Sequence, residues 1–506
     1  MRTNEPAEPS LIEREYLSED QIASGVRLAC LIKPEQDIEV TVLNREPVAS
    51  WRALPGASRS FSRLSSELPR SSGSPLGAAV DIGTTHISVS FYDLSTGEWY
   101  AGRHGLNPQA CFGSDVVTRL IAYNESRETA RTLRGLVIDA IGSAIMDMAV
   151  REGIGPEQVV KVTMVGNTAM LAVLSGRNCD LLLQPAYWMA PLGCLPENPR
   201  EFSSAWGIHP EAIIEVMQPL AGFVGSDLLA GVVGTKLVEK GPGALLIDFG
   251  TNSEMALWDG QSLWVTSAAG GPAFEGCGIG CGIPGGPGAI FQVREHPGGA
   301  AAPGGACPNL EDMIFWSKLA CFDLEFRTID DEKPLGLCGS GIVDLIACLV
   351  RSGRLSSIGR FSPEVPQGGL TLLNGDRQHL LLTKKDVDIF QRAKAAIFAG
   401  VQVLLSMAEM SPAQLRRIYI GGAFGPFGHF LNRDNARQIG LLPDLKSSAI
   451  ELCGNIALRG CEELLMSEDS GKTLDEIKSK AKLINLAQCD GFDDFFMGGL
   501  YLDRIY

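Results

Sequence analysis

Two short segments of the chain share an aspartate, a glycine and small polar residues in the same order. They are DIGTT at 81–85 and DFGTN at 248–252, and each lies between two apolar runs. This pattern predicts a β-hairpin with glycine at the tight part of its turn. Backbone amides and hydroxyls in such a turn can bind phosphate oxygens, and the aspartate can bind Mg²⁺ directly or through water. One such hairpin could be ordinary, but two of them, 248 − 81 = 167 residues apart, indicate a duplicated phosphate-binding site.

A third acidic residue, Asp227, follows the segment GFVGS at 222–226 and stands at the expected start of a helix. There its carboxylate can cap the helix or act as a general base toward an attacking oxygen, and both readings stay open. Two more glycine-rich segments, 336–341 and 421–425, allow close backbone approach to a flat ring or a phosphate. Neither has the GxGxxG or GxxxxGK[ST] pattern of the common nucleotide folds.

The elements around these segments must bring the two turns together. Strands and turns alternate between 76 and 103, and apolar residues then recur every three or four positions from 116 to 151, which predicts helix. The strand–turn–strand pattern returns at 244–258, and Thr383 is a suitable N-cap for a long helix. We therefore expect an α/β protein of two lobes, each with a five-stranded mixed sheet and helices, and a nucleotide cleft between them.

Composition shifts divide the chain into four expected segments. These are a small N-terminal appendage at 1–50, a Ser/Pro-rich linker at 51–77, a first lobe at 78–240 and a second lobe at 241–506. Hydrophobic residues make up 45% of the 506 residues, which is enough for the large cores that two lobes need.

Charge and cysteine usage limit the partners and the compartment. The formal net charge is −16, which argues against nucleic acid and membrane surfaces, because both are bound by clustered Lys and Arg. No apolar run approaches the roughly 20 residues that span a bilayer. The polar start is unlike a signal or transit peptide, and the 13 cysteines are scattered singly, so we expect a cytoplasmic protein with reduced thiols.

Taken in order, the segments resemble the actin-like superfamily of sugar kinases, chaperone ATPases and actin. More closely, residues 78–500 resemble the ATP-dependent reductive activators of corrinoid proteins, the RACo and RamA type. The motifs that carry this resemblance are NPQ (107–109), GSDVVTRL (113–120), VGNTAM (165–170), GFVGSDLLAG (222–231), LLIDFGTNSEMAL (245–257), GGPAFEG (270–276), GLCGSGIVDL (336–345), AKAAIFAGVQVLL (393–405), GGAFG (421–425) and IGLLP (439–443).

The resemblance implies a function and a site. In that family, an ATP-driven conformational change lets a low-potential electron reach an inactive Co(II) corrinoid on a methyltransferase partner, which regenerates Co(I). It implies ATP with Mg²⁺ as cofactors, catalytic roles for Asp81, Asp227 and Asp248, and Mg²⁺ ligands in Asp81 and Asp248. The residues implied to face the phosphates are Gly83, Thr84, Thr85, Gly250, Thr251 and Asn252, and those implied to border the adenosine are Gly339, Ser340, Gly421 and Gly422.

The chain departs from the family at its N-terminal side. Family members typically begin with a ferredoxin domain that carries three clustered cysteines, whereas here Cys30 is preceded by no other cysteine. One local cysteine cannot build a four-thiolate cluster. We therefore expect the ATPase module without its ferredoxin domain, a structural role for Cys30, and electrons from an external low-potential reductase or ferredoxin.

Cys277 and Cys281, in EGCGIGCG, are the other cluster candidates. Two subunits could share a cluster through them, as the related activators of 2-hydroxyacyl-CoA dehydratases do. The expectation is loop packing instead, and no iron–sulfur cluster in this chain. His86 and His429 are interpreted as a strand residue and a surface-loop residue.

The leading hypothesis is an ATPase that promotes reductive activation of a corrinoid protein of a methyltransferase system, acting as a homodimer. Two alternatives remain on the same residues. One is a small-molecule kinase in which Asp227 deprotonates a substrate hydroxyl. The other is a non-catalytic module that binds nucleotide or a corrinoid.

Overall fold

The computed structural model divides the chain into two compact units, residues 1–50 and 51–506. The residues that the structure describes are 2–3, 22–23, 25–27, 40–41, 51–56, 61–62, 64, 68–69, 73–113, 115–296, 317–319, 324–375, 378–424 and 430–504. In the first unit, β1 (Arg2–Thr3) pairs antiparallel with β2 (Val40–Thr41). Cys30 and most of the small N-terminal appendage expected at 1–50 lie outside the described residues.

The first sheet of the second unit has the strand order β3-β6-β5-β4-β7-β8. Its strands are β3 (Arg52–Ala53), β4 (Leu76–Ile82), β5 (His86–Asp93), β6 (Trp99–Leu106), β7 (Val159–Gly166) and β8 (Ile213–Val216). Neighbours are antiparallel from β3 to β4, whereas β7 and β8 join in parallel. Every residue of β4 and β7 is buried, as expected for central strands covered on both faces.

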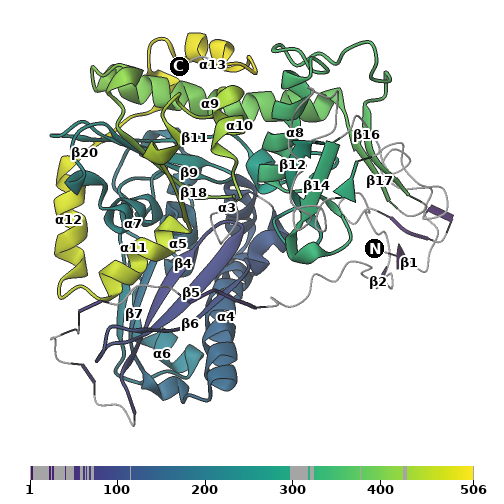
Figure 1. Ribbon diagram of the computed structural model, residues 1–506. Helices are drawn as coiled ribbons and strands as arrows, with labels where there is room; N and C mark the ends of the chain where they lie inside the picture. Colours follow the sequence, from purple (N-terminus) through teal and green to yellow (C-terminus); the bar gives the residue numbers. More distant parts are fainter. Residues whose placement is uncertain are drawn as a thin grey trace. The chain divides into compact units, whose positions relative to one another are not determined.

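Alternate residues of β4 face different helices, as the two-residue period of a strand requires. Ala78 and Val80 belong to the core formed with α4 (Arg127–Glu152), whereas Ala79 belongs to the core formed with α7 (Ser226–Thr235) and α11 (Ile456–Leu465). Figure 1 shows α4 on one side of this sheet and α7 and α11 on the other. The first sheet is therefore completed by a helix from the far end of the sequence.

The second sheet repeats the plan of the first, with the order β11-β10-β9-β18-β19 and β20 added beside β11. Its strands are β9 (Ala244–Phe249), β10 (Ser253–Trp258), β11 (Leu263–Ala268), β18 (Arg417–Gly422), β19 (Ile450–Gly454) and β20 (Ala481–Leu483). Five strands match in the two sheets, so the expected duplication is confirmed. The expected count of five is corrected to six, because the short edge strands β3 and β20 extend each sheet.

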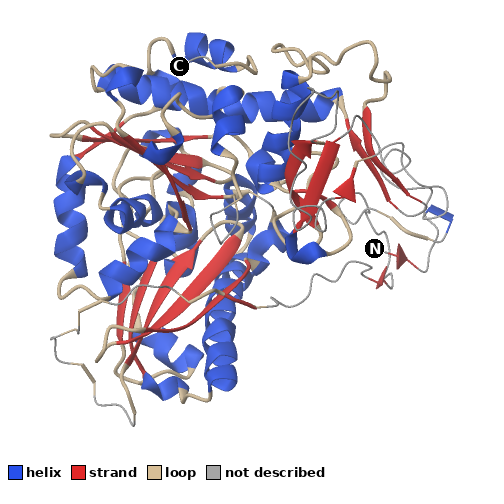
Figure 2. Ribbon diagram, in the orientation of Figure 1, coloured by secondary structure: helices blue, strands red, loops and turns tan. Residues whose placement is uncertain are grey.

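A third sheet, which the sequence did not predict, is inserted in the second half of the chain, between β11 and β18. It consists of β12 (Ala289–Glu295), β13 (Ser317–Lys318), β14 (Leu324–Thr328) and β15 (Gly336–Leu337), and Figure 2 shows its strands in red beside the second sheet. The sequence at 308–320 predicts a helix, and this prediction is wrong at 317–318, because these residues form β13. The hairpin β16 (Leu370–Gly375) and β17 (Gln378–Leu382) follows.

Two long helices, one in each half of the chain, begin with clear capping signals. Thr383 accepts a hydrogen bond from the Asp386 amide at the start of α9 (Lys384–Met407), which confirms the expected N-cap. In the first half, Ser126 caps α4 and separates it from α3 (Val116–Glu125). The remaining helices are α5 (Thr168–Ser175), α6 (Arg200–Trp206), α8 (Gly339–Arg351), α10 (Arg433–Gln438), α12 (Ser470–Lys480) and α13 (Phe492–Gly499). Within the described part of the chain, no helix has both the length and the apolar character needed to cross a bilayer.

Candidate nucleotide-binding site

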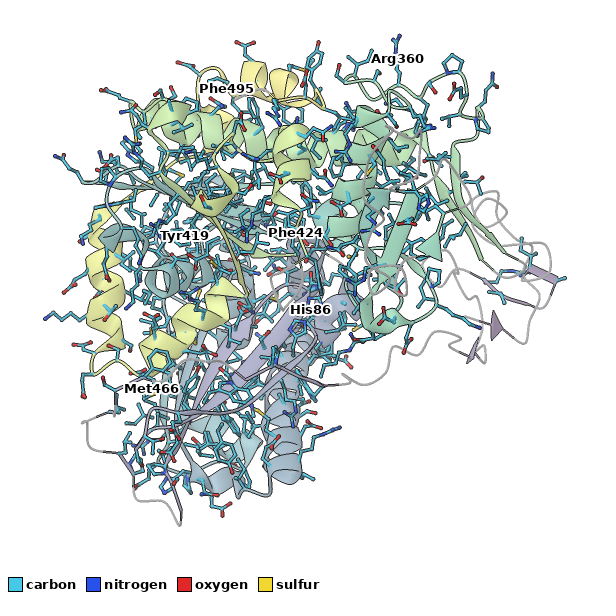
Figure 3. All side chains as sticks on the ribbon, in the orientation of Figure 1. His86, Arg360, Tyr419, Phe424, Met466 and Phe495 are labelled. Atoms are coloured by element: carbon cyan, nitrogen blue, oxygen red, sulfur yellow. The ribbon has the colours of Figure 1, made fainter. Side chains whose placement is uncertain are left out.

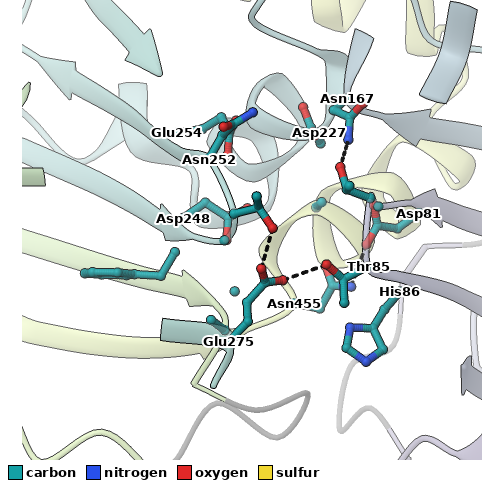
Figure 4. Close-up of a pocket in the computed structure, with 18 of the residues that line it drawn as sticks. Asp81, Thr85, His86, Asn167, Asp227, Asp248, Asn252, Glu254, Glu275 and Asn455 are labelled. Carbon is teal, nitrogen blue, oxygen red and sulfur yellow. Dashed lines mark hydrogen bonds between the residues drawn. The ribbon is translucent and has the colours of Figure 1, made fainter. Parts of the chain in front are cut away.

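The two glycine turns face one another across a pocket. The turn between β4 and β5 supplies one side and the turn between β9 and β10 the other, and Figure 4 shows their side chains around the same space. The predicted residues that line it are Asp81, Gly83, Thr84, Thr85, Asp227, Asp248, Gly250, Thr251, Asn252 and Gly422. Residues that are 167 positions apart in sequence thus form one site.

Polar side chains from three neighbouring segments hold the first turn in place. The Asn107 amide donates to the Gly83 carbonyl over 2.9 Å, and Arg119 Nη1 donates to the Thr84 carbonyl over 2.6 Å. Asn167 Nδ2 donates to Thr84 Oγ1 over 2.6 Å. A Cβ on Gly83 would lie 2.7 Å from the His86 carbonyl oxygen, so glycine is required there. The supporting role of these three side chains was not predicted, although the motifs NPQ, GSDVVTRL and VGNTAM contain them.

The second turn is held by the end of β18. Gly422 has φ +83°, and a Cβ there would lie 2.0 Å from the Phe249 carbonyl oxygen and 2.6 Å from Asp248 Oδ1. The Phe249 ring packs edge-on against Phe424, with centroids 4.8 Å apart, and Figure 3 labels Phe424 near the centre of the view. Gly421 is not among the described residues that line the pocket. A Cβ on Gly421 would lie 3.0 Å from Asp248 Oδ1, so the absence of a side chain leaves room for this carboxylate.

Five carboxylates line the pocket: Asp81, Asp227, Asp248, Glu254 and Glu275. Burial raises the pKa of Asp81 to about 7, against a hydrogen bond from Asn455 and with the help of the Asp227 charge. Burial also raises the pKa of Asp227 to about 6. Burial and then the neighbouring carboxylates raise the pKa of Asp248 and of Glu254 well above the usual range. Each carboxylate thus makes ionisation of the others more costly.

This electrostatic environment suits a divalent cation, because hard cations prefer carboxylate oxygens and relieve repulsion among them. The lining contains no lysine or arginine among the described residues. No three acidic, histidine or cysteine side chains of the described chain already stand in a metal-binding cluster. The carboxylates of the pocket fit Mg²⁺ chemically, and Asp81 and Asp248 are two that could hold it.

Asp227 lies within α7 rather than at its cap. Gly225 is the N-cap, and Asp227 Oδ1 accepts a hydrogen bond from the Leu228 amide over 2.8 Å. The carboxylate lines the pocket. Asp227 is thus not the N-cap of α7, and its carboxylate stands where it could contact a bound ligand.

Glu275, which the sequence analysis did not single out, connects the two turns. Thr85 Oγ1 donates to one carboxylate oxygen over 2.9 Å and Thr251 Oγ1 to the other over 2.5 Å, as the dashed lines in Figure 4 show. Glu275 ends the short 3-10 helix η7 (Pro272–Glu275). The motif GGPAFEG contained the residue, but no local pattern shows that a glutamate will meet two distant threonines.

His86, interpreted from sequence as a strand residue, also lines the pocket. Its ring stacks on His104, with centroids 4.4 Å apart, and His104 Nδ1 lies 3.0 Å from Ser88 Oγ. Burial lowers the pKa of His86 to about 4 and that of His104 to about 3, so both rings are neutral near pH 7. His429 lies outside the described residues.

Gly339 and Ser340, expected at the adenosine, are not in the described lining of this pocket. They begin α8, where a Cβ on Gly339 would lie 1.9 Å from the Phe274 carbonyl oxygen. Ser340 Oγ donates to the Phe291 carbonyl over 2.9 Å. In this structure both residues serve the packing of α8.

Cys277 and Cys281 lie in a loop that follows η7. Burial raises the pKa of the Cys281 thiol to about 12 and raises that of Cys277 as well. The Gly280 amide donates to Asp386 Oδ1 over 2.6 Å, and the Leu337 amide donates to the Cys281 carbonyl over 2.8 Å. The loop is thereby tied to α9 and β15.

Comparison with known proteins places this geometry in a family. The model of the C-terminal domain of RACo, the ASKHA domain, matches residues 243–505, and the model of the RACo middle region matches residues 76–240. The corrinoid activation enzyme RamQ of Eubacterium limosum is 28% identical over 457 residues, which are 85% of this chain and 71% of that protein.

Two further proteins are similar over most of the chain. A reductase of Methanosarcina barkeri, named for a Co(II) methylated amine-specific corrinoid protein, is 25% identical over 446 residues, or 83% of this chain and 76% of that one. The solved structure of a reductive activator for a corrinoid, iron–sulfur protein superimposes with a TM-score of 0.72 at 29% identity. It covers 86% of this chain and 67% of the solved one.

Proposed function

The chain belongs to the RACo family, and we propose that it is an ATP-dependent activator that returns the cobalt of a corrinoid protein from Co(II) to Co(I). The expected family and the duplicated actin-like fold are both confirmed. The observation that carries the proposal is the pair of opposed phosphate turns. Asp81–Thr85 lies in the part that matches the RACo middle region, and Asp248–Asn252 lies in the part that matches the C-terminal ASKHA domain. The corrinoid protein of a methyltransferase system is the proposed partner.

The residues of the pocket have distinct proposed tasks. The turns around Gly83 and Gly250 offer backbone amides and threonine hydroxyls to phosphate oxygens. Asp81 and Asp248 hold Mg²⁺, and Asp227, whose pKa is raised toward neutrality, orients a water and accepts its proton. Bound Mg²⁺–ATP supplies the free energy of hydrolysis to ADP and phosphate.

The two sheets give the protein a bistable element. Nucleotide contacts from both turns favour a closed arrangement of the two lobes, and loss of the terminal phosphate removes that preference. One electron per cobalt comes from an external low-potential reductase or ferredoxin. The proposal includes no iron–sulfur cluster in this chain.

A reconstituted assay tests this function. The protein, a Co(II) corrinoid protein of a methyltransferase system and titanium(III) citrate are mixed anaerobically, and Co(I) formation is followed by absorbance with and without Mg²⁺–ATP. We expect Co(I) and ADP to form together, and Asp248→Asn to lose both. ADP with a phosphorylated metabolite would instead identify a kinase, and nucleotide binding without turnover would identify a binding module.

Iron and acid-labile sulfide in anaerobically purified protein test the electron source. Cluster-free protein that still drives Co(I) formation supports an external donor. Iron near one cluster per two chains would contradict this part of the proposal and point to Cys277 and Cys281.

We also propose a homodimer, as the resemblance implies, and a cytoplasmic location, which the singly scattered cysteines favour. Light scattering during size-exclusion chromatography, with and without Mg²⁺–ATP, tests the oligomeric state. A mass of one chain under both conditions would contradict it.

A further inference from the structure

Glu275 uses both of its carboxylate oxygens to join the two phosphate turns. Its partners, Thr85 and Thr251, belong to opposite sides of the pocket and are separated by most of the first half of the chain. The carboxylate thus bridges the two lobes.

The same two hydroxyls are donors toward a bound phosphate. A hydroxyl hydrogen can be given to only one acceptor at a time in a good geometry, so a phosphate oxygen and Glu275 compete for it. The competition is also electrostatic, because the Glu275 charge already acts on Asp248, which lies in the same pocket. Two anions between these turns would repel each other.

We propose that Glu275 occupies the place of the nucleotide's terminal phosphate between Thr85 and Thr251, and so sets the preference of the free protein between ATP and ADP. This inference rests on the proposed ATP site. ADP lacks the terminal phosphate and leaves Glu275 on the two threonines. ATP must displace it, so the carboxylate lowers the affinity for ATP relative to ADP.

Displacement of Glu275 reaches beyond the pocket. The residue is followed directly by the loop with Cys277 and Cys281, which is hydrogen-bonded to Asp386 of α9 and to Leu337 of β15. A movement of η7 therefore changes the surroundings of Cys277, whose side chain is partly exposed. Binding of the terminal phosphate is thus connected, through η7 and the loop that follows it, to β15 of the third sheet.

The test is calorimetric titration of the full chain with ADP and with a non-hydrolysable ATP analogue, in the presence of Mg²⁺. In Glu275→Ala the ratio of ATP-analogue affinity to ADP affinity should rise by about tenfold or more. Glu275→Gln, which loses the charge but keeps one acceptor, should shift the ratio in the same direction by less. An unchanged ratio, or a ratio that falls, would overturn the inference.

Glu462→Gln is the matched control. Glu462 is a buried glutamate that accepts a hydrogen bond from Ser90 Oγ over 2.7 Å, and it is not among the described lining of the pocket. The ratio should not change in this variant. Circular dichroism shows whether each variant is folded. If Glu275→Ala is not folded, the affinity ratio of Glu275→Gln tests the inference by itself.

A second measurement needs no substitution. Alkylation of Cys277 in the wild-type chain, quantified by peptide mass spectrometry, should change rate with the ATP analogue and not with ADP. Equal rates with both nucleotides would contradict the displacement. If the wild-type chain binds neither nucleotide, the proposed function fails and this inference fails with it; if it binds both, only the ratio and the alkylation rates judge Glu275.

Discussion

Asn455 Nδ2 donates a hydrogen bond to Asp81 Oδ2 over 2.7 Å, which joins the N-cap of α11 to the first phosphate turn across 374 residues of sequence. The other end of the same amide accepts from the Leu458 amide over 2.8 Å and caps the helix. One side chain therefore fixes the start of α11 and favours the charged form of Asp81.

Asn455→Ala should weaken both folding and Mg²⁺-dependent nucleotide binding. Loss of the cap costs about 1 kcal/mol, and loss of a hydrogen bond to a charged group about 1.5–3 kcal/mol. Without the bond the pKa of Asp81 rises further, so less carboxylate is available to Mg²⁺ near pH 7. Urea unfolding and nucleotide titration measure the two effects.

Asn432→Ala is the control for that variant, since Asn432 caps α10 through the Asp434 and Asn435 amides. It should lose only the free energy of a cap and retain nucleotide affinity. Equal nucleotide affinities in the two variants would show that Asn455 does not act through Asp81.

Asp248→Asn should make the protein more stable at neutral pH while it abolishes ATP turnover. Burial raises the pKa of Asp248 above its ordinary 3.8, so the folded state holds this proton more tightly than the unfolded state does. The stability that the aspartic acid contributes is complete below about pH 4 and is lost as the pH rises through the raised pKa. Asparagine has no carboxyl group to ionise, so the Asp248→Asn variant does not lose this stability as the pH rises.

The gap in free energy of unfolding between Asp248→Asn and wild type should therefore widen with rising pH, by at most about 1.4 kcal/mol per pH unit. Urea unfolding between pH 4 and pH 8 measures this gap.

Asp115→Asn is the control, for which the stability difference should have the opposite sign. Hydrogen bonds from Thr118 oppose burial and lower the pKa of Asp115. That variant should be less stable than wild type at neutral pH, with the gap closing in acid; a constant gap for Asp248→Asn would contradict the assignment.

Gly422→Ala should disrupt the second phosphate turn. The added methyl would meet the Phe249 carbonyl and Asp248 at contact distances that real structures do not show, and φ of +83° is itself strained for alanine. Gly353→Ala tests the strain alone, because Gly353 has φ +71° and open space around its Cβ position. The control should cost about 1 kcal/mol, whereas Gly422→Ala should cost several times more in thermal unfolding; similar costs would argue against the close approach.

Arg119→Lys should weaken nucleotide binding, although the charge is kept. Arg119 donates through Nη1 to the Thr84 carbonyl and through Nε to the Gly113 carbonyl, and a lysine ammonium cannot span both sites as the planar guanidinium does. We expect a several-fold loss of affinity in titration calorimetry. Arg134→Lys is the comparison: Arg134 bonds to the Leu174 carbonyl and pairs with Glu201, away from the turn, and should leave the affinity unchanged.

Local chemistry explains which parts of the site were predictable. The sequences at 81–85 and 248–252 each predict a tight turn that requires glycine. Because the pattern occurs twice, it also predicts two sheets with the same strand arrangement. Glu275 and Asn455 carry no such local signal, since their partners lie 190 and 374 residues away. The path of the chain, rather than any motif, brings these side chains to the turns.

Some features of the structure were not anticipated, for physical reasons. Gly339 was expected at a ligand because a glycine at a helix start permits close approach, and the structure shows such an approach to the Phe274 carbonyl. Sequence alone does not distinguish a ligand from a neighbouring backbone. The third sheet went unpredicted because its strands are short and are joined through the glycine-rich stretch at 269–305, where periodicity is weak.

The docking of α11 on the first sheet has a consequence for protein synthesis. Cys461 Sγ contacts the carbonyls of Val80 and Thr163, and Gly460 allows α11 to meet Ala230 of α7. A ribosome produces Thr163 of β7 298 residues before Cys461, and Val80 of β4 381 residues before it. The nascent chain therefore exposes part of an apolar sheet face until α11 has been released, and transient exposure of this kind favours aggregation. The Asp81 turn acquires its Asn455 partner only then, so a partly translated chain has an incomplete nucleotide site.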